Sequence, residues 1–254
     1  MKVALVGRDL FEVEPLLSRF DLELDNDSPE VVISHGGDGT LLGAEREYPS
    51  IPKVALRSSK VCKKCENHKN EVVLAHLAAG ELVETPLLKL QAVKGDQWLT
   101  GLNDIIFRNE IPTSAVRFEV DIDGRNHSGG IIADGLVVAT SFGSSGYYRS
   151  ITHSIFQVGI GLAFNNSTEG VDHLVLREES EITVTVERGP GVVYADNGPD
   201  FFRLEKGDTF EVRKAAEPAR ILGIDTLRCT HCERIPNIRR PYDVDRRVKF
   251  PAVE

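Results

Sequence analysis

The chain has 254 residues, and its 30 Lys and Arg against 39 Asp and Glu give a formal net charge of −9. This length allows one large domain or two smaller ones with a buried core, and the acidic balance argues against non-specific nucleic-acid binding or a polybasic membrane anchor. No uncharged apolar run approaches the ~20 residues of a membrane span, and the apolar stretch at the N-terminus is too short for a signal peptide. We therefore expect a soluble, cytoplasmic protein whose four cysteines are reduced thiols or metal ligands.

Three short apolar runs near the N-terminus predict buried strands, at Val3–Val6, Val31–Ile33 and Lys53–Leu56. Helical spacing of apolar residues follows the first two runs and reappears after residue 70. This alternation of strand and helix predicts an α/β domain over residues 1–84, Rossmann-like, with a mostly parallel sheet.

The predicted helices of this domain have recognisable start signals. Asp9 is a candidate cap for a helix that reaches Phe20, and Pro15 inside it predicts a late start or a kink. A second helix is expected directly after Thr40, and Asn70 is a candidate cap for a third.

The pattern changes after about residue 84. Apolar and polar residues alternate over 116–122, 182–186 and 210–212, and Asp123-Gly124 is a hairpin signal. Period-2 alternation predicts half-exposed antiparallel strands, and therefore a β-rich domain over residues 85–223. We expect residues 224–254 to form a C-terminal tail that returns to the N-terminal domain.

A glycine loop, Gly36 to Thr40, lies between a predicted strand and a predicted helix and reads Gly-Gly-Asp-Gly-Thr. Glycines let phosphate oxygens approach backbone N–H groups, and the helix N-terminus favours an anion. Asp38 in such a loop would accept a proton from an attacking hydroxyl or hold Mg²⁺ against the phosphates. The alternative is a tight turn in which Asp38 is only a turn former. We interpret His35 as a packing or turn residue.

The glycine loop resembles the nucleotide loop shared by NAD kinases, diacylglycerol and sphingosine kinases, and phosphofructokinases. Two further segments favour the NAD kinase family. Gly101-Leu102-Asn103-Asp104-Ile105 resembles the Asn-Glu/Asp pair of that family, and residues 134–147 resemble its Asp-Gly strand and Thr-x-x-Gly-Ser-Thr-Ala-Tyr loop. Asp196 and the stretch 204–208 resemble its final strands, so the resemblance spans about residues 1–223.

The resemblance implies a set of site residues. The donor phosphates would lie against Gly36, Gly37, Gly39 and Thr40, with Asp38 as the catalytic residue. The implied NAD-binding residues are Asn103, Asp104, Asp134, Ser144, Ser145, Gly146 and Tyr147. From the residues alone, an Asn-Asp pair favours a turn. A tyrosine at position 147 is about as typical of a buried β core as of a ring that stacks on a ligand.

The sequence departs from the family pattern at three places. Val54–Lys60 replaces a glycine-rich family loop. In the loop after residue 140, Ser141-Phe142 replaces Pro-Thr and Ser145-Gly146 replaces Thr-Ala. Residues 150–154 stand where the family has Ser-Ala-Gly-Gly-Pro. These changes predict an altered pocket around the nicotinamide end of the acceptor.

All four cysteines fall in two Cys-x-x-Cys pairs, Cys62 with Cys65 and Cys229 with Cys232. This spacing lets both thiolates of a pair face one tetrahedral metal, so we predict a structural zinc site that joins the two segments. Iron is the alternative metal, and a redox dithiol or unrelated thiols are the alternatives to a metal site.

The resulting hypothesis is an NAD kinase that uses Mg²⁺ and transfers a phosphoryl group from ATP or polyphosphate to the 2′-hydroxyl of the adenosine ribose of NAD. The resemblance also implies a homodimer or homotetramer, and we expect neither a nucleic-acid nor a membrane partner. Two alternatives stay open: a kinase with the same loop but a lipid or nucleoside acceptor, and a non-catalytic NAD(P)-binding regulator.

Overall fold

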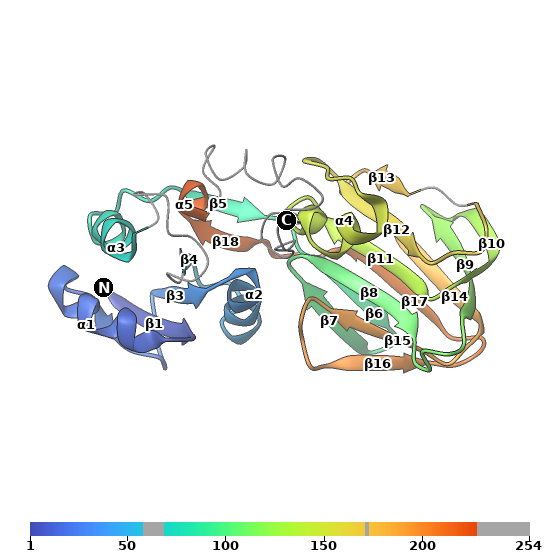
Figure 1. The fold of residues 1–254 in the computed structure, drawn as a ribbon, viewed down its shortest axis with the longest axis horizontal. Helices are drawn as coiled ribbons and strands as arrows, with labels where there is room; N and C mark the ends of the chain where they lie inside the picture. The colour runs from blue at the N-terminus through green and yellow to red at the C-terminus, as the bar shows by residue number, and fades with distance from the viewer. Residues whose placement is uncertain (58–68, 171–172, 228–254) are drawn as a thin grey trace, which may run out of the picture.

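The fold consists of three six-stranded sheets with short helices around the first (Figure 1). It is described from a computed structural model, which covers residues 1–57, 69–170 and 173–227. The first sheet forms one half of the molecule, and the second and third pack against each other in the other half.

The first sheet has the order β2-β1-β3-β4-β18-β5. All of its neighbouring pairs are parallel except the pair β18 and β5, which is antiparallel. Its strands are β1 (Lys2–Gly7), β2 (Glu23–Leu24), β3 (Val31–Gly36), β4 (Lys53–Arg57), β5 (Glu84–Leu87) and β18 (Ala219–Leu222). The predicted α/β fold with a mostly parallel sheet is confirmed. Strand β18, although late in the chain, lies in this first sheet between β4 and β5.

Helices cover both faces of the first sheet. Helix α2 (Asp38–Glu47) packs on one face, and α3 (Asn70–Ala78) packs on the other together with the segment that follows β1. The buried runs in β1 and β3 are apolar at successive positions because each strand contributes side chains to both faces. A last short helix, α5 (Ile224–Leu227), follows β18.

Two helix predictions were wrong in detail. The segment after Asp9 forms no single helix but the short elements η1 (Leu10–Glu12), α1 (Glu14–Leu17) and η2 (Ser18–Phe20). Asp9 has a left-handed backbone and no capping side-chain hydrogen bond, and Pro15 lies in the first turn of α1, where proline fits. Asn70 is the first residue of α3 rather than its cap, a position that Lys69 occupies.

The second and third sheets are antiparallel, in the orders β10-β9-β14-β17-β6-β7 and β13-β12-β11-β8-β15-β16. The strands of the second are β6 (Leu90–Lys94), β7 (Gln97–Gly101), β9 (Val116–Ile122), β10 (Arg125–Ala133), β14 (Ile182–Arg188) and β17 (Thr209–Lys214). Those of the third are β8 (Asp104–Asn109), β11 (Gly135–Thr140), β12 (Ile160–Asn165), β13 (Leu174–Leu176), β15 (Gly191–Ala195) and β16 (Phe201–Leu204), with η4 (Gly143–Ser145) and α4 (Tyr147–Thr152) between β11 and β12.

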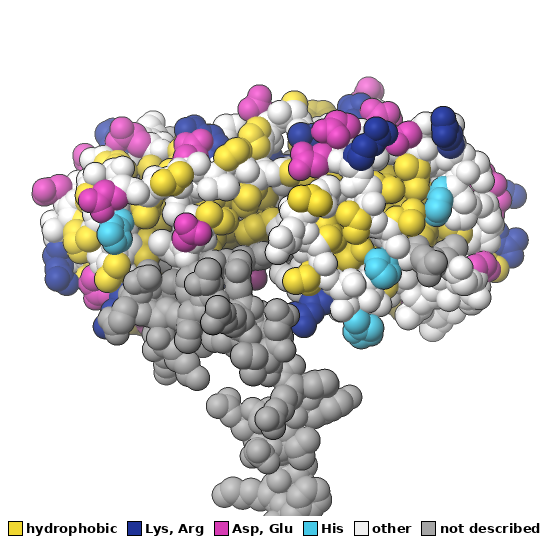
Figure 2. All heavy atoms as spheres, turned by 90° about the horizontal axis from the view of Figure 1, so that it is seen from above, with side chains coloured by type: hydrophobic (Ala, Val, Ile, Leu, Met, Phe, Trp, Pro, Cys, Tyr) yellow, Lys and Arg dark blue, Asp and Glu magenta, His cyan; other side chains and the backbone are white. Residues whose placement is uncertain are grey.

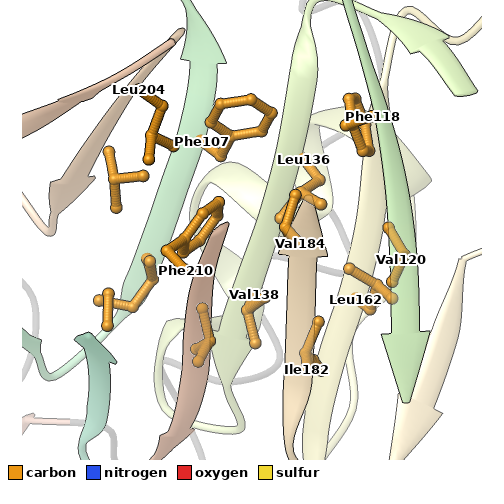
Figure 3. Packing of buried hydrophobic residues seen from close by; sticks show 14 of the residues in the cluster. Phe107, Phe118, Val120, Leu136, Val138, Leu162, Ile182, Val184, Leu204 and Phe210 are labelled. Atoms are coloured by element: carbon orange, nitrogen blue, oxygen red, sulfur yellow. The ribbon is translucent and has the colours of Figure 1, made fainter. Parts of the chain in front are cut away.

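One hydrophobic core joins the second and third sheets (Figure 3). Phe107 of β8 contacts Phe118 of β9 edge to face at 5.4 Å between ring centroids, and Phe210 of β17 at the same distance. The predicted hairpin is confirmed: β9 and β10 pair across Asp123-Gly124, whose φ angles of 51° and 71° suit a tight turn. The predicted β-rich C-terminal region is therefore confirmed as two packed antiparallel sheets.

The surface in Figure 2 carries basic and acidic side chains interspersed with exposed hydrophobic ones. Among the described residues, no helix has the length and apolar character needed to cross a membrane.

Candidate active site

The glycine loop connects β3 to α2 in the first half of the molecule. Gly37 is the N-cap of α2, and Asp38 and Gly39 are exposed in its first turn. A Cβ on Gly36 would lie 2.2 Å from the Thr40 hydroxyl oxygen, so this close packing of strand against helix requires glycine. His35 is fully buried, as predicted for a packing residue, with Nδ1 2.8 Å from the Arg8 carbonyl. The loop thus presents the N-terminus of α2 and one carboxylate to solvent.

A second segment, Gly101 to Asp104, is held by the carboxylate of Asp196. One oxygen of Asp196 accepts the Leu102 N–H at 2.8 Å, and the other accepts those of Asn103 at 2.7 Å and Asp104 at 3.0 Å. The Asp196 N–H in turn donates to the Asp104 carbonyl at 2.9 Å. These bonds fix the backbone of the predicted Asn-Asp pair from the end of β15. Asp196 therefore has a positioning role that its place in the sequence did not indicate.

Asp104 and Asp196 form a coupled pair of carboxyl groups. Burial, reinforced by the charge of Asp196, raises the pKa of Asp104 to about 7. Burial also raises the pKa of Asp196, but three backbone N–H donors and the Arg46 guanidinium oppose that rise. Because these groups favour the ionised form of Asp196, Asp104 is the member of the pair that holds a proton near neutrality.

A third segment, from Thr140 to Tyr147, packs directly on the Asn-Asp pair. The Thr140 N–H donates to the Asn103 carbonyl at 2.8 Å, and the Thr140 hydroxyl donates to the Leu102 carbonyl at 2.7 Å. A Cβ on Gly143 would lie 2.1 Å from the Asn103 carbonyl oxygen. This contact explains why a small-residue loop follows β11, and Ser145 and Gly146 stay exposed at its tip.

Other predicted site residues lie around this loop. Ser144 is buried, and its hydroxyl donates to the carbonyls of Ser141 and Phe156 at 2.8 and 3.0 Å. Tyr147 is half-buried, and its hydroxyl accepts an N–H of Asn165 at 3.2 Å. Asp134 accepts an N–H of the Asn166 side chain at 2.7 Å. Ser144 is therefore a loop-building residue here, with its hydroxyl donor already used.

Asn197 joins the two halves of the molecule at the glycine loop. Its side-chain N–H donates to the Gly39 carbonyl at 3.0 Å, across 158 residues of sequence, and its oxygen accepts an N–H of Arg46 at 3.3 Å. Asn197 directly follows Asp196, so one short turn contacts both the glycine loop and the Asn-Asp pair. The structure thus brings together the loop, the Asn-Asp pair, the Thr140–Tyr147 segment and the Asp196 turn. Sequence reasoning missed Arg46 and Asn197, because only their long-range contacts give them a place in the site.

Within residues 1–57, 69–170 and 173–227, no group of three or more His, Cys, Asp or Glu side chains is arranged to hold a metal ion. Cys62, Cys65, Cys229 and Cys232 lie outside the described residues, as does part of the altered segment Val54–Lys60.

Comparison with known proteins identifies the family. Residues 102–223 match the family described as the ATP-NAD kinase C-terminal domain. A NAD kinase from Gemmatimonas aurantiaca is 31% identical over 216 residues, which are 78% of this chain and 74% of the relative. The chain belongs to the NAD kinase family. A second NAD kinase, from Halorubrum lacusprofundi, is 28% identical over 209 residues, or 76% of this chain and 74% of its own length.

Solved structures of NAD kinase folds superpose over nearly the whole chain. A NAD kinase from Archaeoglobus fulgidus in complex with ATP has a TM-score of 0.75 at 20% identity, covering 91% of this chain and 97% of the other. Yeast NADH kinase complexed with NADH has a TM-score of 0.73 at 17% identity, covering 100% of this chain and 90% of the other. The arrangement of one α/β half and one antiparallel half is therefore the NAD kinase fold.

Proposed function

We propose that this protein is a NAD kinase, which transfers a phosphoryl group to the 2′-hydroxyl of the adenosine ribose of NAD to give NADP. The observation that carries the proposal is the Asp196-Asn197 turn, which contacts Gly39 on one side and the backbone of Asn103 and Asp104 on the other. A loop suited to phosphates and a polar pair suited to a ribose thus share one junction. Membership of the NAD kinase family supports the same reaction.

The proposed mechanism gives each segment one task. The exposed N–H groups at the start of α2 would receive the donor phosphates, with Gly36, Gly37, Gly39 and Thr40 forming the cradle. Asn103 and Asp104 would orient the acceptor ribose and adenine, with Asp134, Ser144, Ser145, Gly146 and Tyr147 around them. Asp38, exposed at the loop, would accept the proton of the attacking 2′-hydroxyl.

The residues at the loop fit a magnesium ion that arrives with the donor. Mg²⁺ commonly uses one or two carboxylates and takes its remaining ligands from phosphates and water. Asp38 is such a carboxylate, exposed beside the phosphate cradle. Bound Mg²⁺ would neutralise charge on the phosphate oxygens.

The test is an NADP assay with matched binding measurements. Purified protein with NAD, ATP and Mg²⁺ should form NADP, and Asp38→Asn should lower kcat by about 100-fold or more because a positioned base contributes that much. Thermal shift with NAD should be the same for both proteins. No NADP from the wild-type protein would contradict the proposal. Binding of NAD and ATP without turnover would instead support the regulator, and turnover of another alcohol in place of NAD would support a different acceptor.

We also propose that Cys62, Cys65, Cys229 and Cys232 bind one structural zinc ion. The support is the sequence: two Cys-x-x-Cys pairs use all four cysteines and fit a tetrahedral tetrathiolate site. Such a site would tie the segment after β4 to a C-terminal tail over residues 224–254. We keep the proposed domains at 1–84 and 85–223 as a division of the chain, from which β5 and β18 cross into the first sheet. Metal analysis of freshly purified, reduced protein should find about one zinc per chain, and a content near zero would contradict the site.

We further propose that the protein forms a homodimer or homotetramer. Exposed apolar side chains on and beside the edge strand β13 support this proposal: Ile155 is 54% exposed, Val158 75% and Val175 50%. An exposed apolar patch next to an unpaired strand edge is typical of a surface that another chain covers.

A further inference from the structure

A short turn follows β15 and carries Asn197 toward the other half of the molecule. Asp196 in this turn has a left-handed backbone, with a φ of 51°, which Asp tolerates better than most residues. The Gly198 N–H closes the turn by donating to the Ala195 carbonyl at 2.9 Å. The Asp196 carboxylate accepts the N–H groups of residues 102–104. Asn197 therefore belongs to a turn whose backbone is fixed by its own half.

The side chain of Asn197 contacts helix α2 at two levels. Its Nδ2 donates to the Gly39 carbonyl at 3.0 Å, and its Oδ1 accepts from Arg46 Nη1 at 3.3 Å. Gly39 and Arg46 are seven residues apart, which is two helical turns, so they lie on one face of α2. Figure 1 shows α2 at the side of the α/β half that faces the antiparallel half.

These two contacts select one orientation of the Asn197 amide. A carbonyl oxygen only accepts hydrogen bonds and a guanidinium only donates them, so neither contact forms if the amide nitrogen and oxygen exchange places. Arg46 thus keeps the N–H group of Asn197 directed at Gly39.

The glycine at position 39 fits this contact closely. A Cβ there would lie 3.2 Å from Asn197 Nδ2, which is tighter than an ordinary van der Waals contact. Gly39 lies in the first turn of α2 with helical backbone, so its conformation alone does not demand glycine. In a loop suited to phosphates, this glycine therefore also makes room for Asn197.

The contact holds the part of α2 that carries the proposed chemistry. Asp38 directly precedes Gly39, while Asp196, which directly precedes Asn197, holds the backbone of the Asn-Asp pair. Two adjacent residues thus join the proposed base to the proposed acceptor residues. Phosphoryl transfer depends mainly on positioning, and a misplacement of about 1 Å can lower its rate about 100-fold.

We propose that Asn197 is a positioning residue for phosphoryl transfer, which holds the first turn of α2 at a fixed distance from the Asn-Asp pair, and that Arg46 acts through it by orienting its amide. The inference rests on the proposed kinase function, since it concerns the geometry of that reaction. It requires no contact of Asn197 with either substrate.

A second link keeps the halves together when Asn197 is removed. The ion pairs of Glu45 with Lys53 and Lys89 hold the later part of α2. Loss of the Asn197 amide would therefore release the first turn of α2 without separating the halves. Turnover should fall more than affinity for NAD, because Asp196 still holds the Asn-Asp pair.

Steady-state kinetics of NADP formation test the positioning role. Asn197→Ala should lower kcat about 10- to 100-fold, as expected for a displacement of up to about 1 Å, with the KM for NAD within about threefold. Asn126→Ala, at an exposed asparagine of the edge strand β10, is the matched control and should change neither parameter. Equal kcat values for Asn197→Ala and the wild-type protein would overturn the proposal, as would a raised KM for NAD with unchanged kcat.

A double-mutant cycle tests the role of Arg46. Arg46→Ala should lower kcat by a smaller factor than Asn197→Ala, because the amide remains but is less well oriented. The double variant should have the kcat of Asn197→Ala alone, since Arg46 acts through that amide. If the two losses in kcat multiply instead, Arg46 acts independently of Asn197 and its proposed role is overturned.

Hydrogen exchange tests the contact without turnover. Asn197→Ala should speed amide exchange over residues 36–42, because the first turn of α2 loses its bond to the other half, and should leave residues 101–105 unchanged. Unchanged exchange over residues 36–42 would overturn the proposal. If exchange rises there but the wild-type protein forms no NADP, the restraint on α2 stands and the kinase function fails. If Asn197→Ala forms NADP at the wild-type rate, the kinase function stands and the positioning role fails.

Discussion

Asp104 is a buried carboxyl group whose pKa is raised by its surroundings. It begins β8 and is almost fully buried beside the ionised Asp196, whose own charge is stabilised by three backbone N–H donors. Burial and that neighbouring charge together favour the protonated form of Asp104. At neutral and alkaline pH Asp104 must ionise in this buried site, and this lowers the free energy of unfolding.

Asp104→Asn should therefore stabilise the protein at alkaline pH. With a folded-state pKa of about 7 against the ordinary 3.8, the folded chain keeps a proton that the unfolded chain has released. The contribution of Asp104 to the free energy of unfolding is thus greatest at low pH. It falls as the pH rises from about 4 to 7 and stays constant above that. At about 1.4 kcal/mol per pKa unit, the variant should gain up to a few kcal/mol at pH 8 and almost nothing at pH 4.

Urea unfolding of both proteins at pH 4, 6 and 8 measures this difference. Asp134→Asn, at a partly exposed carboxylate of the same half, is the control and should show no comparable trend. A gain for Asp104→Asn that is the same at all three pH values would contradict the assignment of the proton to Asp104.

Helix α2 is the element on which both halves of the site depend. It starts at the glycine loop, and two turns later Glu45 is buried between Lys53 of β4 and Lys89, which precedes β6. The Lys89 ammonium is 2.8 Å from one Glu45 oxygen, and Lys53 pairs with the other. Burial lowers the pKa of Lys53, an effect that the Glu45 carboxylate opposes. This one carboxylate therefore links the first sheet, α2 and the start of the second sheet.

Glu45→Gln should destabilise the fold by about 3–5 kcal/mol, because it leaves two buried ammonium groups without their shared carboxylate. Glu47→Gln, at an exposed position of the same helix, should change stability by less than about 0.5 kcal/mol. Chemical denaturation at pH 7 compares the two variants with the wild-type protein. Equal stability of Glu45→Gln and Glu47→Gln would show that the buried carboxylate has no such role.

The same elements show what the sequence could predict. Apolar runs and period-2 alternation predicted the strands of both halves, and the motif at Gly36–Thr40 predicted the strand-to-helix loop, because these signals are local. In the segment after Asp9, Pro15 predicted a late start, and α1 does begin at Glu14. The division of the rest into short 3-10 turns was missed, since nothing in its apolar spacing distinguishes them from one helix. Asn197 and Arg46 could not be found in the same way, because each gains its place through partners in other elements.

At the scale of the whole molecule, the α/β half supplies the glycine loop and the antiparallel half supplies the polar residues beside it. The two are linked by the Asn197 contact with Gly39 and by the ion pairs of Glu45 with Lys53 and Lys89. Exposed apolar side chains at Ile155, Val158 and Val175 lie on and beside β13, an edge strand of the third sheet, and provide the proposed contact between chains.

Val158→Asp should therefore shift the protein to a smaller assembly. A charge at this 75% exposed position would oppose burial against a second chain while leaving the fold of each chain unchanged. Light scattering coupled to size-exclusion chromatography measures the mass. Val83→Asp, at a side chain that is also 75% exposed but in the other half, is the control. A wild-type protein with the mass of one chain, or an unchanged mass for Val158→Asp, would contradict assembly through this patch.

The position of β18 has a consequence for the order in which the chain can fold during synthesis. β18 lies between β4 and β5, although it is made more than a hundred residues after either of them. Until residue 222 has left the ribosome, the nascent first sheet lacks the strand between β4 and β5, and β5 has no strand to pair with. The antiparallel half, in contrast, has all of its strands by residue 214. The first sheet, although its first strands are synthesised earliest, therefore gains its last strand only after every strand of the antiparallel half has been made.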